Sequence, residues 1–357
     1  MKRTTIIAAL TAFTTLAVNA QTNPLTISGY VEGYYAYDFS KPVNNLRPSF
    51  TYNHTRNNEI NLNLGLLKAA YATDNVRANL GLMVGTYAQY NLAAESDVFR
   101  NLYEANAGVK LSKNSNLWLD AGIFAAHIGW ESAIGKDNWT LTRSIAAENS
   151  PYYEAGAKIS YTSADSKLFL SGLVLNGWQR IQRVDGNQST AFGTQITYKP
   201  TASVTLNSST FIGNDKPEIS RQYRYFHNLY GIFQLNQKVG LILGFDAGIE
   251  QKSKKSNDYN TWYSPTGILR YKPSAKVSLA GRAEYYSDEN GVIISSGTPN
   301  GFKTWGYSAN VDYSPYQNIT FRLEGKIYDS KDAIFTRESG SSTNNNSAIT
   351  TAVAVSF

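Results

Sequence analysis

The chain has 357 residues, of which 42% are hydrophobic and only 17% charged, and it carries 25 tyrosines and a formal net charge of +6. It has no run of about 18 apolar residues, which excludes a helical membrane protein. It also has no cysteine, which excludes thiol nucleophiles, cysteine-ligated zinc and iron–sulfur clusters. The charge is mild and dispersed, so nucleic acid is not expected as a partner.

The first residues have the pattern of an export signal. Lys2 and Arg3 precede the apolar stretch "TTIIAALTAFTTLAV", and "VNA" then offers small residues before a cleavage site. A buried hydrophobic strand is the less favoured alternative. The sequence therefore predicts a signal peptide over residues 1–20 and a single mature domain over residues 21–357.

A period-two alternation of apolar and polar residues recurs from one end of the mature chain to the other, as expected for strands. Some segments are less clean: "LFLSGLVLNGW" is apolar on both faces, and "YRYFHNLYGIFQL" is ambiguous. The clearest examples are "LTISGYVEGYYAYD", "NEINLNLGLL", "VRANLGLMVGTYAQ", "KVGLILGFDAGIEQ" and "ITFRLEGKIY".

The alternation gives about sixteen candidate strands (14–18), each roughly ten to fourteen residues long, enough for a tilted membrane-spanning strand. Tight turns such as "ATDN", "KPTA" and "SPYQ" follow the even-numbered strands, whereas longer polar connections follow the odd-numbered ones. The longest connections are residues 40–57, 90–101, 130–151, 287–301 and 330–344.

Short turns at one end and long loops at the other are typical of outer-membrane barrels. We therefore predict an all-β, antiparallel, up-and-down transmembrane barrel with short periplasmic turns and long extracellular loops, located in the bacterial outer membrane. The last strand, "TTAVAVSF", would close the barrel against the first and leave Phe357 at the periplasmic rim. Tyrosines near strand ends fit an interfacial aromatic belt: Tyr37, Tyr71, Tyr161, Tyr198, Tyr271 and Tyr313.

Several strings resemble the β-barrel porin family described as OmpL-like, notably "SPYYEAG" and "NGWQ", in a region from about Ser28 to beyond Trp178. The resemblance implies an outer-membrane barrel with pore activity, and it brings neither a substrate nor functional residues. A C-terminal strand that ends in an aromatic residue also resembles the signal read by the barrel assembly machinery.

If the apolar strand faces meet lipid, the opposite faces line the lumen, where a sixteen-strand barrel is wide enough for water. Charges of both signs there would set ion and solute preference, although paired charges that only brace the wall are the alternative. The pore-lining candidates are Glu32, Arg77, Glu104, Asp120, Glu154, Lys158, Asp246, Arg282, Glu284, Arg322 and Glu324.

One long connection, residues 130–151, carries two tryptophans and several charges, and it is the first candidate for a loop that folds inward and narrows the channel. An outward-facing cap is the alternative, and residues 40–57 and 90–101 are further candidates. The constriction residues expected in the first loop are Glu131, Asp137, Arg143 and Glu148.

Enzymatic interpretations fit poorly, and no cofactor is expected. Only three histidines occur, no G-x-S-x-G motif is present, and no histidine spacing suits a metal. His127 and Ser132 lie close together in "HIGWES", but no orienting group is evident from the sequence.

The function predicted from these patterns is a porin that lets small hydrophilic solutes and ions diffuse through a water-filled channel. The alternative is a closed structural or adhesive barrel whose loops bind a partner. Expected partners are outer-membrane lipid, the barrel assembly machinery through the strand ending in Phe357, and lipopolysaccharide, for which Lys252–Asn257 is a candidate contact or simply a solvated loop. A homotrimer is a candidate assembly by analogy with other sixteen-strand porins alone.

Overall fold

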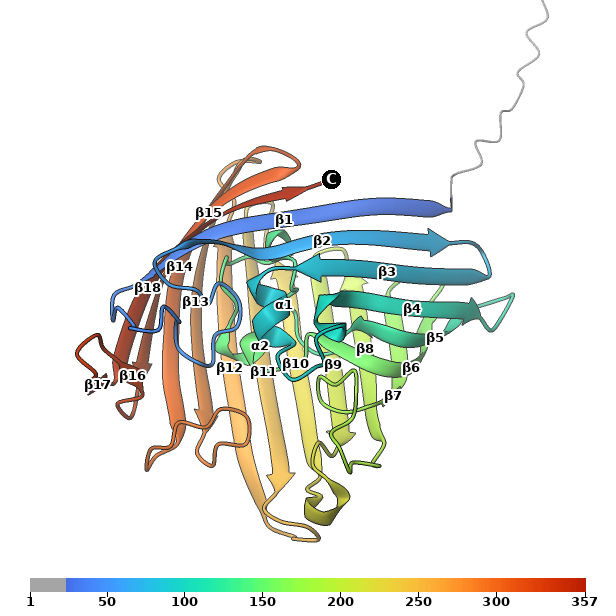
Figure 1. Cartoon of the computed structure of the whole chain (residues 1–357). Helices are drawn as coiled ribbons and strands as arrows, with labels where there is room; N and C mark the ends of the chain where they lie inside the picture. Colours follow the sequence, from blue (N-terminus) through green and yellow to red (C-terminus); the bar gives the residue numbers. More distant parts are fainter. Residues whose placement is uncertain (1–23) are drawn as a thin grey trace, which may run out of the picture.

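The structure is a computed structural model and describes residues 24–357. The predicted signal peptide lies outside the described residues and stays a prediction. Within the described residues, sixteen antiparallel strands form one closed barrel (Figure 1). None of the helices in this part of the chain is long and apolar enough to cross a membrane.

The sixteen barrel strands agree with the number predicted from the alternation. The first eight are β1 (Leu25–Asp38), β2 (Ile60–Ala72), β3 (Val76–Val84), β4 (Leu102–Lys110), β5 (Asn116–Ala125), β6 (Tyr153–Thr162), β7 (Leu168–Leu175) and β8 (Ala191–Thr201). The others are β9 (Val204–Gly213), β10 (Arg224–Gln234), β11 (Val239–Gln251), β12 (Tyr259–Tyr271), β13 (Val277–Asp288), β14 (Phe302–Tyr316), β15 (Ile319–Ser330) and β18 (Asn345–Ser356).

The last barrel strand closes the sheet against the first, as predicted. Strand β18 lies between β15 and β1, with Tyr30 opposite Ser356. Beyond the strand, Gly29 and Phe357 exchange two backbone hydrogen bonds of 2.8 and 3.0 Å. Closure pairs the backbone groups of every strand on both sides, which a barrel needs in lipid because no water is available to satisfy them.

The connections also follow the predicted pattern. Only two residues join β8 to β9 and two join β14 to β15, at what we call the short-turn end. The connections that leave the opposite, long-loop end contain the short helices α1 (Thr86–Asn91) and α2 (Ile145–Glu148) and a small hairpin of β16 (Phe335–Thr336) and β17 (Ser342–Thr343). Single 3-10 turns are η1 (Phe99–Asn101), η2 (Gly135–Asp137) and η3 (Glu218–Ser220).

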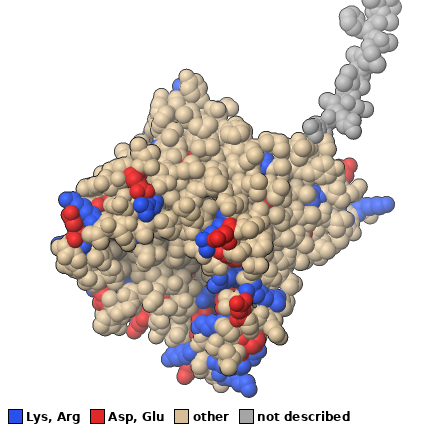
Figure 2. All heavy atoms as spheres, viewed as in Figure 1, with Lys and Arg blue, Asp and Glu red and all other residues tan. Residues whose placement is uncertain are grey.

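The outer wall is apolar because alternate residues of each strand face outward. In β10, Leu229 is 44% exposed, whereas its neighbour Asn228 on the inner face is fully buried. Uncharged residues cover most of the surface visible in Figure 2, and the charged side chains form a few separate groups on it. The belt tyrosines Tyr71, Tyr198, Tyr271 and Tyr313 are exposed beside short turns, in keeping with an interfacial position.

The inner wall differs from the prediction in one respect, because its long-loop half carries many buried aromatic rings among its polar side chains. Strands contribute buried rings there, which pack against Phe50, Ile128 and Ile145 from connections that fold into the barrel. Rings that pack against folded loops bury apolar surface away from water. The inward rings are Phe124, Phe211, Phe226, Trp262, Tyr286, Phe302 and Tyr328.

Candidate functional site in the barrel interior

The connection between β5 and β6, residues 126–152, crosses the interior of the barrel. The backbone N–H of Gly129 donates to Asn228 of β10 at 3.2 Å, and that of Ile145 donates to Glu284 of β13 at 2.6 Å. These strands are far from β5 and β6 around the barrel, so the segment spans the lumen. We call residues 126–152 the inward segment; its helix α2 lies within the ring of strands in Figure 1.

A buried cluster of charges on β13 and β15 holds this segment. Arg282 and Glu324 form an ion pair of 3.0 Å, and Lys326 and Glu284 form another of 2.9 Å, all four with side chains at most 2% exposed. Arg282 also donates to the hydroxyl of Thr140 and to the carbonyl of Thr142 at 2.9 and 2.8 Å. We call Arg282, Glu284, Glu324 and Lys326 the clamp cluster.

The clamp cluster recognises the backbone of the inward segment as well as its side chains. Glu324 accepts from the N–H of Thr142 at 2.5 Å and from its hydroxyl at 2.9 Å. Lys326 donates to the carbonyl of Arg143 at 2.9 Å. Buried charges are tolerated when they are paired and hydrogen-bonded, so the loop and the wall satisfy each other's polar groups.

A second anchor lies nearer the short-turn end, on β14 and β15. Arg322 makes a bidentate pair with Asp312 and also donates to the carbonyls of Gly135 and Asn138, at 2.6 and 3.0 Å. The side-chain oxygen of Asn310 accepts from the N–H of Leu141 at 3.0 Å. Glycines in the wall also let the segment approach, since a side chain at Gly244 would overlap the ring of Trp130.

The four predicted constriction residues have different environments. Arg143 is fully buried and donates to the carbonyls of Ser132, Ala133 and Leu141, so it shapes the segment from within. Glu131 accepts hydrogen bonds from Ser144. Asp137 is exposed and pairs with Lys136.

Glu148, the fourth of them, ties the inward segment to the connection between β1 and β2. Its carboxylate accepts from the backbone N–H groups of Tyr52 and Asn53 at 3.0 and 3.2 Å. Burial raises the pKa of Glu148 above its ordinary value, although these hydrogen bonds and the charge of Arg143 act in the opposite direction. The group thus joins two connections inside the barrel.

A second inward connection, residues 39–59, meets Glu32 of β1. The His54 ring lies 2.8 Å from Glu32 through Nε2, and Asn63 donates to the same carboxylate oxygen at 2.8 Å. Burial lowers the pKa of His54, and this effect outweighs the opposing hydrogen bond and charge of Glu32. Glu32 therefore lies on the inner wall, in contact with a folded loop.

His127 lies at the start of the inward segment and contacts Glu154 of β6. Its Nδ1 is 2.8 Å from the Glu154 carboxylate, and its Nε2 is 2.7 Å from the carbonyl of Thr210. Burial lowers the pKa of His127, but the charge of Glu154 and both hydrogen bonds outweigh it, so the net shift is upward. Both ring nitrogens face acceptors, an arrangement that favours the imidazolium, in which both nitrogens donate.

This geometry does not support the serine hydrolase considered from the sequence. An orienting carboxylate, Glu154, is present, but Nε2 of His127 is bonded to a carbonyl and not to Ser132, whose hydroxyl oxygen accepts from Ile134. A general base needs a free ring nitrogen toward its nucleophile. In residues 24–357, no group of three or more histidine, aspartate or glutamate side chains is arranged to hold a metal ion.

The remaining wall candidates lie around two chambers at the short-turn end. A chamber of about 330 Å³ is lined by Arg77, Asp120, Glu104 and Lys158, and a smaller one of about 170 Å³ lies beside Arg270 and Arg322. Arg77 and Asp120 are ion-paired across β3 and β5, and Glu104 pairs with Lys68. Asp246, by contrast, is buried and accepts from Asn228 at 2.5 Å.

Two of the cations at these chambers that make no ion pair with any described residue lie over aromatic rings. The Nζ atom of Lys158 lies 4.7 Å from the centroid of the Phe124 ring, and the guanidinium of Arg270 lies 3.9 Å from that of Trp139. The sequence predicts the inner face for Lys158, but it does not indicate these aromatic contacts. A period-two pattern predicts on which face of a strand a residue lies, but not which residues it contacts across the lumen.

The fold and the charged interior define a porin-type β-barrel of the bacterial outer membrane. The sequence matches, over residues 24–357, the family described as "Putative beta-barrel porin-2, OmpL-like", and the chain belongs to this family. The family and the fold support an outer-membrane channel rather than an enzyme. No curated protein matches the sequence.

Solved porin structures share the fold at low sequence identity. The trimer form of the outer membrane protein OmpT of Vibrio cholerae matches with a TM-score of 0.61 and 10% identity, over 93% of this chain and 99% of that one. The anion-selective porin from Comamonas acidovorans matches with 0.61 and 7%, over 93% and 99%. The outer membrane channel DcaP of Acinetobacter baumannii matches with 0.58 and 12%, over 93% and 97%.

Proposed function

We propose that the chain is a porin for passive diffusion of small hydrophilic solutes and ions, narrowed by the inward segment. The observation that carries this proposal is the clamp cluster, which fixes the segment across the lumen through buried ion pairs. A fixed constriction leaves defined passages beside it, whereas an unattached loop would not. The two chambers at the short-turn end are the parts of this passage with charged, accessible walls.

Ion preference in this proposal comes from the chamber walls rather than from the clamp cluster. Arg282 and Glu324 are fully buried and hold the loop, so their charges are neutralised locally. Arg77 and Lys158 are partly exposed at the larger chamber, where Arg77 is paired with Asp120 and Lys158 makes no ion pair among the described residues. Charges that face water across a narrow passage bias the passing ions.

One observation favours the alternative of a closed barrel that binds a partner through its loops. The buried aromatic residues of the long-loop half pack directly against inward connections, with Phe50 in ring contact with Phe302 and Tyr328 at 4.8 and 5.2 Å. If this packing persists in the membrane, it blocks the passage at that end.

A liposome-swelling assay separates the two functions. Proteoliposomes should swell quickly in isotonic arabinose and progressively more slowly in glucose, sucrose and raffinose, because a narrowed passage sieves by size. Arg77→Glu should leave this order unchanged and shift the reversal potential in a salt gradient toward cations. An absence of swelling in all four sugars, with folded and inserted protein, would contradict the porin and favour the closed barrel.

Assembly and partners are part of the same proposal. The OmpT match is described as a trimer, and a homotrimer is the arrangement we propose to test by cross-linking in outer membranes. The exposed ring of Phe357 lies against Gly29 at the closing seam, where the barrel assembly machinery would read the last strand. Lipopolysaccharide contact at residues 252–257 stays a prediction.

A further inference from the structure

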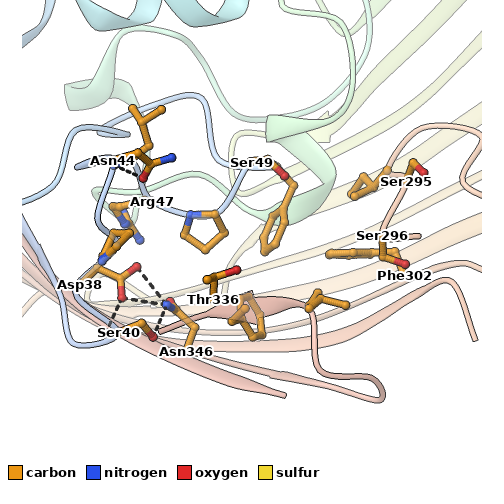
Figure 3. Close-up of a pocket in the computed structure, with 17 residues that line it drawn as sticks. Asp38, Ser40, Asn44, Arg47, Ser49, Ser295, Ser296, Phe302, Thr336 and Asn346 are labelled. Atoms are coloured by element: carbon orange, nitrogen blue, oxygen red, sulfur yellow. Dashed lines mark hydrogen bonds between the residues drawn. The ribbon is translucent and has the colours of Figure 1, made fainter. Parts of the chain in front are cut away.

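A cavity of about 310 Å³ at the long-loop end lies apart from the two chambers and from the clamp cluster. It is formed by the connections after β1, after β13 and after β15, which meet at the mouth of the barrel (Figure 3). We call this cavity the mouth pocket. The residues that matter for its chemistry are Asp38, Arg47 and Asn346 on the polar side and Phe50, Phe302 and Phe335 on the apolar side.

Arg47 is a buried cation without a counterion in the described part of the chain. It is 3% exposed, and its side chain makes one long hydrogen bond, from Nη1 to the carbonyl of His54 at 3.4 Å. Its Nε is buried with no acceptor. Arg56, which pairs with Leu46 across the same loop, is by contrast bidentate to Glu59 at 2.7 and 2.9 Å.

A buried guanidinium that lacks a carboxylate is costly, and such a group is usually paired. The backbone keeps Arg47 in place all the same, because its N–H donates to the carbonyl of Thr55 at 2.9 Å. Arg47 lines the pocket, and apart from the long bond of Nη1 its side-chain donors have no acceptor among the described residues, so an acceptor that enters the pocket can bind the guanidinium. A planar guanidinium favours a carboxylate, which it can bind with two parallel hydrogen bonds.

Asp38, the acidic group that faces the pocket, is already satisfied by its neighbours. Its carboxylate accepts from Nδ2 of Asn346 at 2.8 and 2.9 Å and from the N–H of Ser40 at 2.8 Å. Figure 3 shows these bonds on the polar side of the pocket. Asp38 therefore does not occupy the guanidinium of Arg47, and no ion pair joins the two in the described residues.

The opposite wall offers a surface for an apolar body. The Phe50 ring makes an edge contact with Phe302 at 4.8 Å, and Phe335 lies 6.2 Å from Phe50, so Phe50 joins the three rings into one aromatic cluster that lines the pocket. All three are at most 5% exposed. Rings fixed in this way can contact a flat aromatic or short aliphatic group with little loss of conformational entropy.

We propose that the mouth pocket binds small organic carboxylates that carry an aromatic or aliphatic body. The carboxylate occupies the donors of Arg47, and the body lies on Phe50, Phe302 and Phe335. The volume is at the lower end of ligand pockets and suits one small molecule. This site does not depend on an open pore, because the pocket is present whether the barrel conducts or is closed.

The test uses the full folded protein in detergent micelles, with phenylacetate as the probe and empty micelles as the blank. Titration calorimetry should show saturable binding of phenylacetate. Phenylacetamide lacks the charge and acetate lacks the apolar body, and both should bind roughly tenfold more weakly or worse. Arg47→Gln should weaken phenylacetate binding by a similar factor and leave phenylacetamide unaffected, whereas Phe335→Ala should weaken both.

The matched control is Lys41→Gln, which removes an exposed cation from the same connection, where it pairs with Glu338 at 3.6 Å, and should leave binding unchanged. Equal affinity of wild type for phenylacetate and phenylacetamide would overturn the proposal, as would unchanged binding by Arg47→Gln or no binding by folded wild type. If Arg47→Gln does not fold, the comparison of the two probes on wild type decides. Binding by a protein that fails to swell liposomes would refute the porin and leave this site intact.

Discussion

The clamp cluster gives the sharpest prediction, through the substitution Arg282→Met. The methionine keeps an unbranched apolar side chain of similar length but removes the hydrogen bonds to Thr140 and Thr142 and the ion pair with Glu324. Glu284 and Glu131 also lose their contacts with the guanidinium, at 3.4 and 3.6 Å. Buried carboxylates then face one another with Lys326 as the main cation left in the cluster.

Removing one partner of a buried ion pair costs about 3–5 kcal/mol. If this cost destabilises the state in which the inward segment is bound to the wall, the fraction of molecules with a detached segment rises roughly a hundredfold or more, at about 1.4 kcal/mol per factor of ten. Two assays should report this. Single-channel recordings should show larger and noisier currents, and trypsin should cleave faster after Lys136, whose side chain is 41% exposed.

Arg77→Met is the matched control, since its ion pair with Asp120 is 33% exposed on the arginine side and involves no residue of the inward segment. Such pairs contribute about 1 kcal/mol or less, so this variant should keep the wild-type cleavage rate. Identical currents and identical cleavage for folded Arg282→Met and wild type would refute the role given to the clamp cluster.

Three further outcomes follow from the same structure. His127→Gln should lower the free energy of unfolding more at pH 5 than at pH 8. The raised pKa of His127 stabilises the folded state below the unfolded pKa of about 6.5, and this effect is lost as the pH rises through the folded value. His54→Gln should lower the free energy of unfolding more at pH 8 than at pH 5, because the lowered pKa of His54 disfavours the folded state at the lower pH. Equal losses at both pH values in urea titrations would contradict both assignments. Phe226→Ala, which removes a ring in contact with Trp178 and Trp262 at 4.8 and 6.2 Å, should cost about 3–5 kcal/mol in the same titrations, and a loss below 1 kcal/mol would mean that the aromatic half is loosely packed. Leu229→Arg, at the centre of β10 on the outer wall, should lower the free energy of unfolding by about 2–4 kcal/mol for protein folded in lipid vesicles. The control Leu229→Ala should lower it much less. Similar losses for both variants would mean that this wall does not face lipid.

The strand pattern could be predicted from the sequence because it depends on local alternation and turn chemistry. Strand β11, for example, alternates outward Leu243 with inward residues such as Ile242, and the Pro- and Asn-rich turns mark the strand ends. The choice of residues 130–151 as an inward loop rested on their length and their tryptophans. Nothing local indicates their anchors, since Thr142 and Glu324 are 182 positions apart.

The aromatic half of the lumen was missed for a related reason. "LFLSGLVLNGW" is apolar on both faces because Leu173 and Leu175 point inward and join the buried aromatic cluster. "YRYFHNLYGIFQL" is ambiguous because Phe226 points inward while Tyr225 and Leu229 point outward. Inward residues that pack on folded loops are apolar, as are outward residues that meet lipid, so the alternation of apolar and polar residues cannot by itself separate the two faces.

The central claim is that water and ions pass through this barrel beside a clamped segment. Single-channel conductance of the refolded protein in a planar bilayer, with reversal potentials under a salt gradient, tests it most directly. We expect discrete, persistent open steps and a selectivity that changes with Arg77→Glu. Silence from protein shown to be folded and inserted would contradict it and would indicate a barrel closed by its own loops.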